Sequence, residues 1–300
     1  MKMICGILAA AMLLARPVPA AEAAERTVVL DGEFYLDEDI VFSKSGRTMD
    51  ILHPVETSGP LPAIVWIHGG GWGAGDKRRG ARNILPFAER GYVCVSISYR
   101  LTDEAVFPAQ IHDCKAAIRY LRAHAGQYGI DPDRIGVWGA SAGGHLAALL
   151  GTSGGITGLE GDEGWPDFSS RVQAVCDWYG PVDFYSAAHQ APEDRRPEKL
   201  LGGEVLENRE LAALASPVSH ATPDDPPFLI MHGTRDDVVP LKQSRLLKWA
   251  LSRQGVPVYF SVVRGGEHGG ERFEQEKVRA KVMKFFDAHL KGPGPAQPLP

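Results

Sequence analysis

The chain has 300 residues and a mass of 32.5 kDa, enough for one large α/β domain or two small domains. A content of 44% hydrophobic and 23% charged residues supports a full apolar core and excludes a disordered or fibrous chain. The net charge of -5 argues against nucleic acid binding, which needs a basic surface. With 34 glycines and 22 prolines, the composition favours a loop-rich soluble enzyme over a helical bundle.

The N-terminus has the pattern of a secretory signal. Lys2 supplies a positive charge, residues 4–15 are an apolar run too short to span a bilayer, and residues 18–20 (VPA) offer a small-residue cleavage site. We therefore expect a signal peptide over residues 1–23, with cleavage after Ala20 or within residues 21–24. The mature chain is then secreted or periplasmic, without stable membrane association.

Residues 24–291 are expected to form one domain. Short strands are predicted at 27–30, 34–36 and 48–52, and continuous apolar runs predict strands at 63–67 and 92–98 that are buried on both faces. Further on, helices alternate with strands: a helix opened by Pro108, strand 134–138 after a turn at 131–133, helix 142–150, strands 172–178 and 228–231, helix 241–254, strand 258–263 and helix 271–290.

This alternation predicts an α/β fold with a mostly parallel central sheet and helices on both faces. Two long insertions, 151–170 and 186–225, interrupt the rhythm, and such insertions often shape substrate sites. The Pro/Gly-rich tail at 292–300 is expected to be disordered.

Cysteines are few. Outside the signal only Cys94, Cys114 and Cys176 remain; they allow at most one disulfide, and Cys94 and Cys176 lie in strand-like segments as expected for buried, inert thiols. Since no pair has CxxC spacing, we predict neither a structural zinc site nor any other metal or cofactor.

Residues 139–143 (GASAG) follow the predicted strand ending at Trp138 and precede a predicted helix. This is the strand–turn–helix context in which G-x-S-x-G presents a nucleophilic serine, because small neighbours leave the hydroxyl of Ser141 free above the sheet. The helix behind it directs its positive end toward developing negative charge. The alternative is an ordinary glycine turn.

Residues 68–72 (HGGGW) come directly after strand 63–67. Glycines allow backbone N–H groups to approach a tetrahedral oxyanion closely, and removing one such donor costs about 3 kcal/mol of transition-state stabilisation. A phosphate-binding loop is the competing interpretation, but no G-x-G-x-x-G or G-x-x-x-x-G-K-[ST] pattern is present.

A serine nucleophile needs an imidazole oriented by a carboxylate. Asp236 and Asp237 follow the strand ending at Met231, and His268 follows the next strand in a glycine-rich loop. The chain order Ser141, acid, His268 is that of α/β-hydrolases. We predict Asp236 as the acid, with Asp237 as the fallback and Asp183 as a remote alternative.

Together these motifs, with residues 98–101 (SYRL), 107–110 (FPAQ) and 131–135 (DPDRI), resemble the hormone-sensitive-lipase-like branch of the α/β-hydrolases over about residues 30–290. Within it, the chain resembles bacterial carbohydrate esterases that act on acetyl or feruloyl esters of xylan. The resemblance implies that the amides of Gly70, Gly71 and Ala142 form the oxyanion hole.

Other side chains near these motifs have weaker assignments. Trp72, Trp178 and Tyr179 are candidates for lining the acyl or alcohol pocket, with plain packing equally expected. His145, four residues after Ser141, is expected to be a packing or hydrogen-bonding residue. His68 is expected to brace its own loop.

The sequence thus predicts an exported serine carboxylesterase acting on short acyl or hydroxycinnamoyl esters, small or on plant polysaccharide such as xylan. Its oligomeric state is not predicted. One alternative is a serine peptidase of the prolyl-oligopeptidase kind, although such enzymes usually carry a large additional N-terminal domain. A second is a non-enzymatic binding module on the same fold.

Overall fold

The computed structural model describes residues 26–29, 32–78, 80–190 and 193–292. The predicted signal over residues 1–23 and, apart from Gly292, the predicted tail over residues 292–300 lie outside the described residues. Within the described ranges, no helix is long and apolar enough to cross a membrane.

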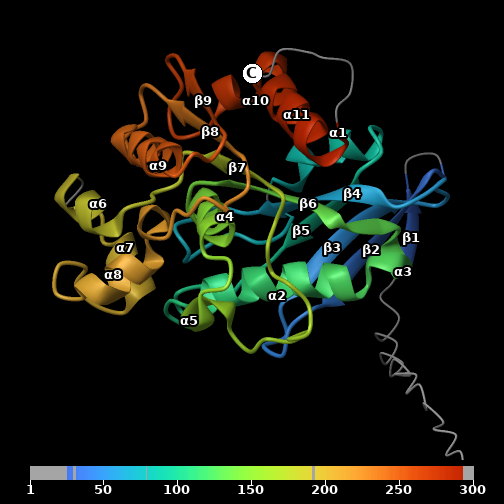
Figure 1. Cartoon of the computed structure of the whole chain (residues 1–300), viewed down its shortest axis with the longest axis horizontal. Helices are drawn as coiled ribbons and strands as arrows, with labels where there is room; N and C mark the ends of the chain where they lie inside the picture. Colours follow the sequence, from blue (N-terminus) through green and yellow to red (C-terminus); the bar gives the residue numbers. More distant parts are fainter. Residues whose placement is uncertain (1–25, 30–31, 79, 191–192, 293–300) are drawn as a thin grey trace, which may run out of the picture.

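The described strands form one nine-stranded sheet in the order β1-β2-β3-β5-β4-β6-β7-β8-β9 (Figure 1). The first three strands are antiparallel to their neighbours, and the six from β5 to β9 are parallel. This confirms the predicted mostly parallel α/β fold. The strands are β1 (Arg26–Val29), β2 (Phe34–Val41), β3 (Thr48–Pro54), β4 (Leu61–Ile67), β5 (Val93–Ile97), β6 (Ile130–Ala140), β7 (Ala174–Trp178), β8 (Phe228–Gly233) and β9 (Val258–Val263).

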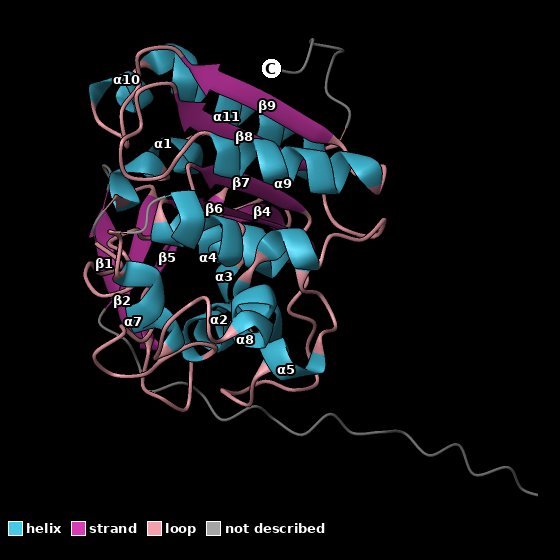
Figure 2. Ribbon diagram, turned by 90° about the vertical axis from the view of Figure 1, so that its left-hand side faces the viewer, coloured by secondary structure: helices cyan, strands magenta, loops and turns pink. Residues whose placement is uncertain are grey.

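The parallel strands are buried on both faces because helices cover each side. Along β4, Ala63 and Val65 pack in one apolar cluster with α2 (Ala109–Ala123), α4 (Ala142–Thr152) and α9 (Lys242–Arg253). The alternating residues Ile64 and Trp66 pack in a second cluster with α1 (Leu85–Ala88) and α11 (Glu276–Leu290). Figure 2 shows this stacking of helices against the sheet. Because successive side chains of a strand point to opposite faces of the sheet, each buried strand contributes to both apolar clusters.

Shorter helices complete the chain. They are α3 (Ala125–Tyr128), α5 (Thr157–Glu160), α6 (Phe184–Gln190), α7 (Arg196–Leu201), α8 (Arg209–Ala215), α10 (Glu271–Glu274) and the 3-10 turns η1 (Ala81–Asn83) and η2 (Pro217–Ser219).

Three predicted boundaries were wrong. Strand β2 continues to Val41, past acidic residues that break its apolar pattern and through a register shift between Asp37 and Ile40. The predicted turn at 131–133 lies within β6, at a register shift against β4. The predicted helix 271–290 is two helices, α10 and α11, because the backbone at Gln275 is extended (φ -61°, ψ 139°).

The two insertions serve different parts of the molecule. The first contains α5 and is anchored to α2 by the buried Lys115, whose ammonium group donates to the Ser153 carbonyl and to Glu160, both at 2.7 Å. The second contains α6, α7, α8 and η2, between β7 and β8 in the chain. Only the second insertion lines the pocket described below.

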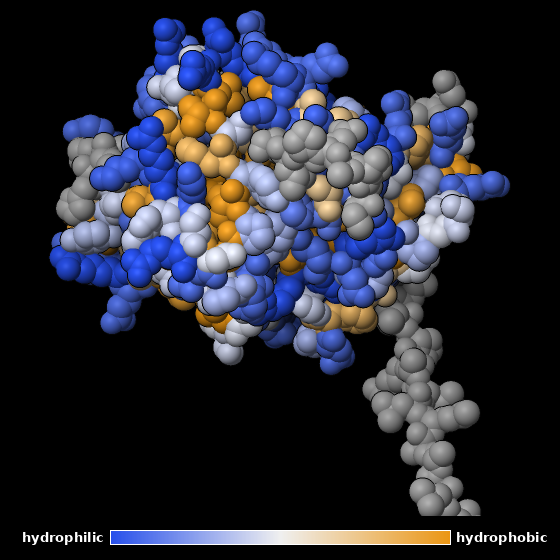
Figure 3. Space-filling model, turned by 45° about the horizontal axis from the view of Figure 1, so that its top comes forward, coloured by the Kyte–Doolittle hydropathy of each residue, from blue (hydrophilic) through white to orange (hydrophobic). Residues whose placement is uncertain are grey.

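The face of the molecule shown in Figure 3 is mostly polar. On the face shown in Figure 3, hydrophobic side chains form small separate groups among charged ones. Such scattered apolar exposure is ordinary for a folded chain, and most large apolar side chains of the described residues are in the two clusters.

Candidate active site

Ser141 stands on a sharp turn between β6 and α4. Its backbone has a positive φ (57°, with ψ -122°), which is rare for a residue with a side chain and typical of strained functional positions. Its N–H donates to the Trp178 carbonyl at 2.9 Å, which fixes the turn against β7. Gly139 makes the turn sterically feasible, because a Cβ there would lie 2.1 Å from the Gly143 carbonyl oxygen.

The structure brings Ser141, His268 and Asp236 into one hydrogen-bonded row. His268 Nε2 lies 2.7 Å from Ser141 Oγ, and His268 Nδ1 lies 2.8 Å from Asp236 Oδ2. The three residues come from loops after β6, β9 and β8, which end at the same edge of the sheet. In this arrangement the Ser141 hydroxyl donates to Nε2, and Nδ1–H donates to the carboxylate.

Asp236 is surrounded by donors. The amides of Val238 and Val239 donate to Oδ1 at 3.0 and 2.8 Å, while Oδ2 faces His268 and, at 3.2 Å, Nε2 of His232. Burial opposes ionisation, but the hydrogen bonds from His232, His268 and the Val239 amide outweigh it and hold the pKa of Asp236 well below its ordinary value. Asp236 is therefore a carboxylate at neutral pH.

The other candidate acids lie elsewhere. Asp237, the fallback, is exposed. Asp183, the remote alternative, accepts the Ser186 amide at 3.1 Å at the start of α6. Of the three acids considered from the sequence, the structure places only Asp236 beside His268.

His232 is a second imidazole on Asp236 that the sequence reasoning missed. It is fully buried at the end of β8, with Nε2 2.8 Å from the Val239 carbonyl and Nδ1 2.7 Å from Ser244 Oγ. The carbonyl requires Nε2–H to donate, so Nδ1 accepts from the Ser244 hydroxyl. In this tautomer, the Nε2–H group faces both the Val239 carbonyl oxygen and Asp236 Oδ2. The sequence does contain a signal for His232: it directly follows a predicted strand and lies four residues before the predicted acid.

Replacing His232 tests this second contact. We expect His232→Leu to lower kcat about 10²-fold with little change in KM, because Asp236 loses a partner and shifts relative to His268. His232→Gln keeps an N–H donor at the position of Nε2 and should recover most of kcat. Steady-state kinetics of both variants measure this difference, and equal losses in the two would show that His232 serves packing alone.

The glycine tract after β4 lies directly against Ser141. A Cβ on Gly69 would be 2.7 Å from the Ala140 carbonyl and 3.2 Å from the Ser141 Cβ, so only glycine fits at this approach. Among the described residues, the amides of Gly70 and Gly71 donate no backbone hydrogen bond. Ala142 is the first residue of α4, where helix geometry leaves amides without an intrahelical acceptor. The loop of His68 is braced by stacking on Tyr99, with ring centroids 4.3 Å apart.

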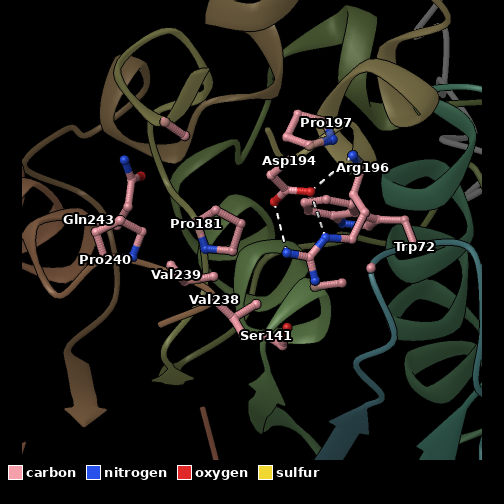
Figure 4. A pocket seen from close by; sticks show the side chains of 13 residues that line it. Trp72, Ser141, Pro181, Asp194, Arg196, Pro197, Val238, Val239, Pro240 and Gln243 are labelled. Atoms are coloured by element: carbon pink, nitrogen blue, oxygen red, sulfur yellow. Dashed lines mark hydrogen bonds and ion pairs between the residues drawn. The ribbon is translucent and has the colours of Figure 1, made fainter. Parts of the chain in front are cut away.

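A pocket leads to Ser141 (Figure 4). Gly71, Trp72 and Ala142 form its wall on the side of β4 and α4. The remaining lining residues are mostly apolar and come from the loop after β7, the second insertion, the loop before α9 and the first turn of α9: Pro181, Ala187, Asp194, Arg196, Pro197, Val238, Val239, Pro240 and Gln243. Serine and glycine amides thus meet at the end of an accessible cleft.

The three aromatic candidates have different places. Trp72 lines the pocket and donates from Nε1 to His145 Nδ1 at 3.1 Å. Trp178 does not line it: its ring packs 4.8 Å from that of Trp138 in the core, because its side chain points to the opposite face of the sheet from α4. Tyr179 is also buried outside the pocket lining, with its ring 4.7 Å from that of His268.

His145 has the packing role expected of it. It is fully buried on α4, its Nε2–H donates to the Ala215 carbonyl at 2.8 Å, and its Nδ1 accepts from Trp72. Burial lowers the pKa of His145 to about 4, so the ring is neutral at pH 7. It ties α4 and Trp72 to the second insertion.

Asp177 is a buried acid behind the site. Its Oδ1 accepts the Gly180 amide at 2.9 Å, and its Oδ2 has no partner among the described residues. Burial raises the pKa of Asp177 to about 7. In the unfolded chain the pKa of this carboxyl has its ordinary value of 3.8. Between pH 3.8 and pH 7, the folded state therefore keeps a proton that the unfolded state loses. Stability contributed by this group is therefore lost as the pH rises through that window.

We expect Asp177→Asn to be more stable than the parent at pH 8, by about 4 kcal/mol at most, and similar to it at pH 4. The amide keeps the acceptor for Gly180 and removes the ionisation. Urea unfolding at both pH values measures the difference, with the exposed Asp167→Asn as the control. A stability difference between Asp177→Asn and the parent that does not depend on pH would contradict the raised pKa of Asp177.

The described residues contain no group of His, Cys, Asp and Glu side chains suited to a metal ion. Cys94, Cys114 and Cys176 are free and buried, and burial raises the pKa of each thiol.

Comparison with known proteins shows that this chain is similar to esterases. The BD-FAE family model matches residues 49–251. The carboxylic ester hydrolase LipM of Mycobacterium tuberculosis, described as probable, is 34% identical over 70% of this chain and 50% of its own length. This chain spans about half the length of the curated relatives it matches.

Two solved structures match this chain over nearly their whole length. A truncated carbohydrate esterase from gut microbiota has 35% identity and a TM-score of 0.75, covering 81% of this chain and 91% of that one. The esterase Est2 of the planctomycete Thermogutta terrifontis, solved with propionate bound, has 26% identity and a TM-score of 0.71, covering 92% and 98%.

Proposed function

This chain belongs to the BD-FAE family of α/β-hydrolases, and we propose that it is a serine carboxylesterase that uses Ser141, His268 and Asp236. The observation that carries the proposal is the row from Ser141 Oγ through His268 to Asp236, with contacts of 2.7 and 2.8 Å, at the end of an open pocket. The esterase names of similar proteins support it.

In the first half of the reaction, His268 Nε2 takes the proton of Ser141 as Oγ attacks the ester carbonyl carbon. The amides of Gly70, Gly71 and Ala142 bind the oxyanion that forms, and Asp236 stabilises the imidazolium. His268 then protonates the leaving alcohol as the C–O bond breaks. An acyl group remains on Ser141.

In the second half, water replaces the alcohol. His268 takes a proton from the water, hydroxide attacks the acyl carbonyl, and the same amides bind the second oxyanion. Collapse releases the carboxylic acid and returns the proton to Ser141. The chain's own groups perform each proton transfer, so no cofactor enters the scheme.

The substrates we propose are short acyl or hydroxycinnamoyl esters, carried on a plant polysaccharide such as xylan. Support comes from the carbohydrate esterase similar to this chain and from the propionate bound to the Thermogutta esterase. The predicted signal over residues 1–23 would deliver the enzyme outside the cytoplasm, where such polymers occur. N-terminal sequencing of the mature protein tests that export.

Rates on acetyl, octanoyl and feruloyl esters of one alcohol test the substrate class. The proposal predicts that kcat/KM for the acetyl or feruloyl ester exceeds that for the octanoyl ester. A preference for the octanoyl ester would contradict the polysaccharide substrate but not the esterase mechanism. Cleavage of a prolyl peptide without ester hydrolysis would instead favour the peptidase alternative.

A further inference from the structure

One charged pair lies in the otherwise largely apolar pocket. Asp194 and Arg196 come from the second insertion, Arg196 being the first residue of α7, and both line the pocket that leads to Ser141. Figure 4 shows the two side chains in contact above Ser141, with Trp72 on one side. The proposed acyl transfer uses neither of them.

The pair is held in one orientation. Arg196 Nε and Nη2 donate to the two carboxylate oxygens of Asp194 at 2.6 and 2.9 Å, and the Arg196 amide donates to Oδ1 at 3.0 Å. A two-point contact between a planar guanidinium and a carboxylate fixes both groups in a common plane. The side chains are 44% and 21% exposed, so ligand atoms entering the pocket can reach them.

The pair also has a fixed place relative to the reacting groups. A Cβ on Gly71 would lie 2.8 Å from Cδ of Arg196, so the aliphatic part of Arg196 packs on the backbone of the glycine tract. Gly71 itself lines the pocket next to Ser141 and Ala142. Arg196 is therefore anchored on the wall of the pocket that leads to Ser141.

The chemistry of the pair selects one kind of ligand group. Its guanidinium has N–H donors beyond those that face Asp194, and the carboxylate has acceptor lone pairs. An alkyl group would remove water from these atoms without replacing their hydrogen bonds, and a carboxylate on the ligand could accept from Arg196 but has no hydrogen to donate to Asp194. A hydroxyl group both donates and accepts, so it satisfies the two partners together.

We propose that Asp194 and Arg196 form a subsite for a hydroxyl group close to the scissile ester, which makes the enzyme selective for partly acylated polyols over alkyl esters of equal size. This rests on the proposed function, since Ser141 must be the group that attacks the ester. The pair determines specificity; it takes no part in proton transfer.

Two acetate esters of nearly equal shape test the subsite. 2-Hydroxyethyl acetate has a hydroxyl where propyl acetate has a methyl group. We expect the ratio of their kcat/KM values to fall about tenfold in Arg196→Met, because the methionine keeps the packing on Gly71 but has no guanidinium. Asp194→Asn should lower the ratio in the same direction. The intrinsic reactivity of each ester cancels between enzymes.

Arg195→Met is the matched control. Arg195 is adjacent, 59% exposed, paired with Glu198 and Glu204, and outside the pocket lining. The ratio of the kcat/KM values for the two acetate esters should be the same in Arg195→Met as in the parent enzyme. An unchanged ratio in Arg196→Met, or an equal fall in Arg195→Met, would overturn the subsite.

The labelling rate of Ser141 by a fluorophosphonate separates this proposal from the previous one. Labelling and hydrolysis of both esters with an unchanged ratio would defeat the subsite alone. Absence of labelling and of hydrolysis of either ester in the parent enzyme would defeat the proposed function. Labelling of Arg196→Met at the parent rate would show that the variant is folded with its reactive serine intact.

Discussion

Ser141→Ala is expected to lower kcat about 10⁶-fold, to the level that binding and oxyanion stabilisation provide without a nucleophile. The hydroxyl of Ser141 is the group that the proposed mechanism acylates, and alanine offers no proton to His268 in its place. KM should change little, since the pocket walls remain. Hydrolysis of 4-nitrophenyl acetate provides the measurement.

Ser219→Ala serves as the control for this loss. Ser219 is an exposed serine of η2, away from the residues that line the pocket, and its replacement should leave kcat within twofold of the parent. Residual activity of Ser141→Ala above a few per cent of the parent, with the fold intact by circular dichroism, would exclude Ser141 as the nucleophile.

Asp236→Asn is expected to lower kcat about 10⁴-fold, the size of loss seen when a triad acid becomes an amide. Asp236 accepts from His268, His232 and two backbone amides, and an asparagine must turn an NH₂ group toward some of these donors. His268 then carries its proton on Nε2, and a protonated Nε2 can no longer accept the proton of the Ser141 hydroxyl. The variant should therefore differ from the parent in kcat.

Asp237→Asn is the natural comparison, because the two acids are adjacent and sequence reasoning could not separate them decisively. Asp237 is exposed, so its replacement should leave kcat within about twofold, as for most surface changes. A larger loss for Asp237→Asn than for Asp236→Asn would show that the acid had been misassigned.

The parts of the site predicted from sequence are those with a fixed position relative to a strand. Ser141 follows β6 within G-x-S-x-G, the glycine tract follows β4, and His268 follows β9. Parallel strands bring their carboxyl ends to one edge, so such residues converge whatever the loops do. The fold class was predictable for a related reason, since continuous apolar strands alternate with amphipathic helices.

Other parts depend on contacts that no local pattern records. Trp178 was a candidate for the pocket, but strand parity directs its side chain to the far face of the sheet. Asp194 and Arg196 lie in an insertion whose sequence has no strand or motif to place it beside Gly71. The contact of His232 with Asp236 depends on how the loop after β8 folds back.

The nucleophile is tested most directly by treating the protein with a fluorophosphonate and locating the adduct by mass spectrometry. A serine activated by His268 attacks the phosphorus, fluoride leaves, and the adduct marks the reactive oxygen. We predict one adduct, on the peptide that contains Ser141, absent from Ser141→Ala and formed far more slowly in Asp236→Asn. An adduct on another serine, or equal labelling of Ser141→Ala, would contradict the mechanism.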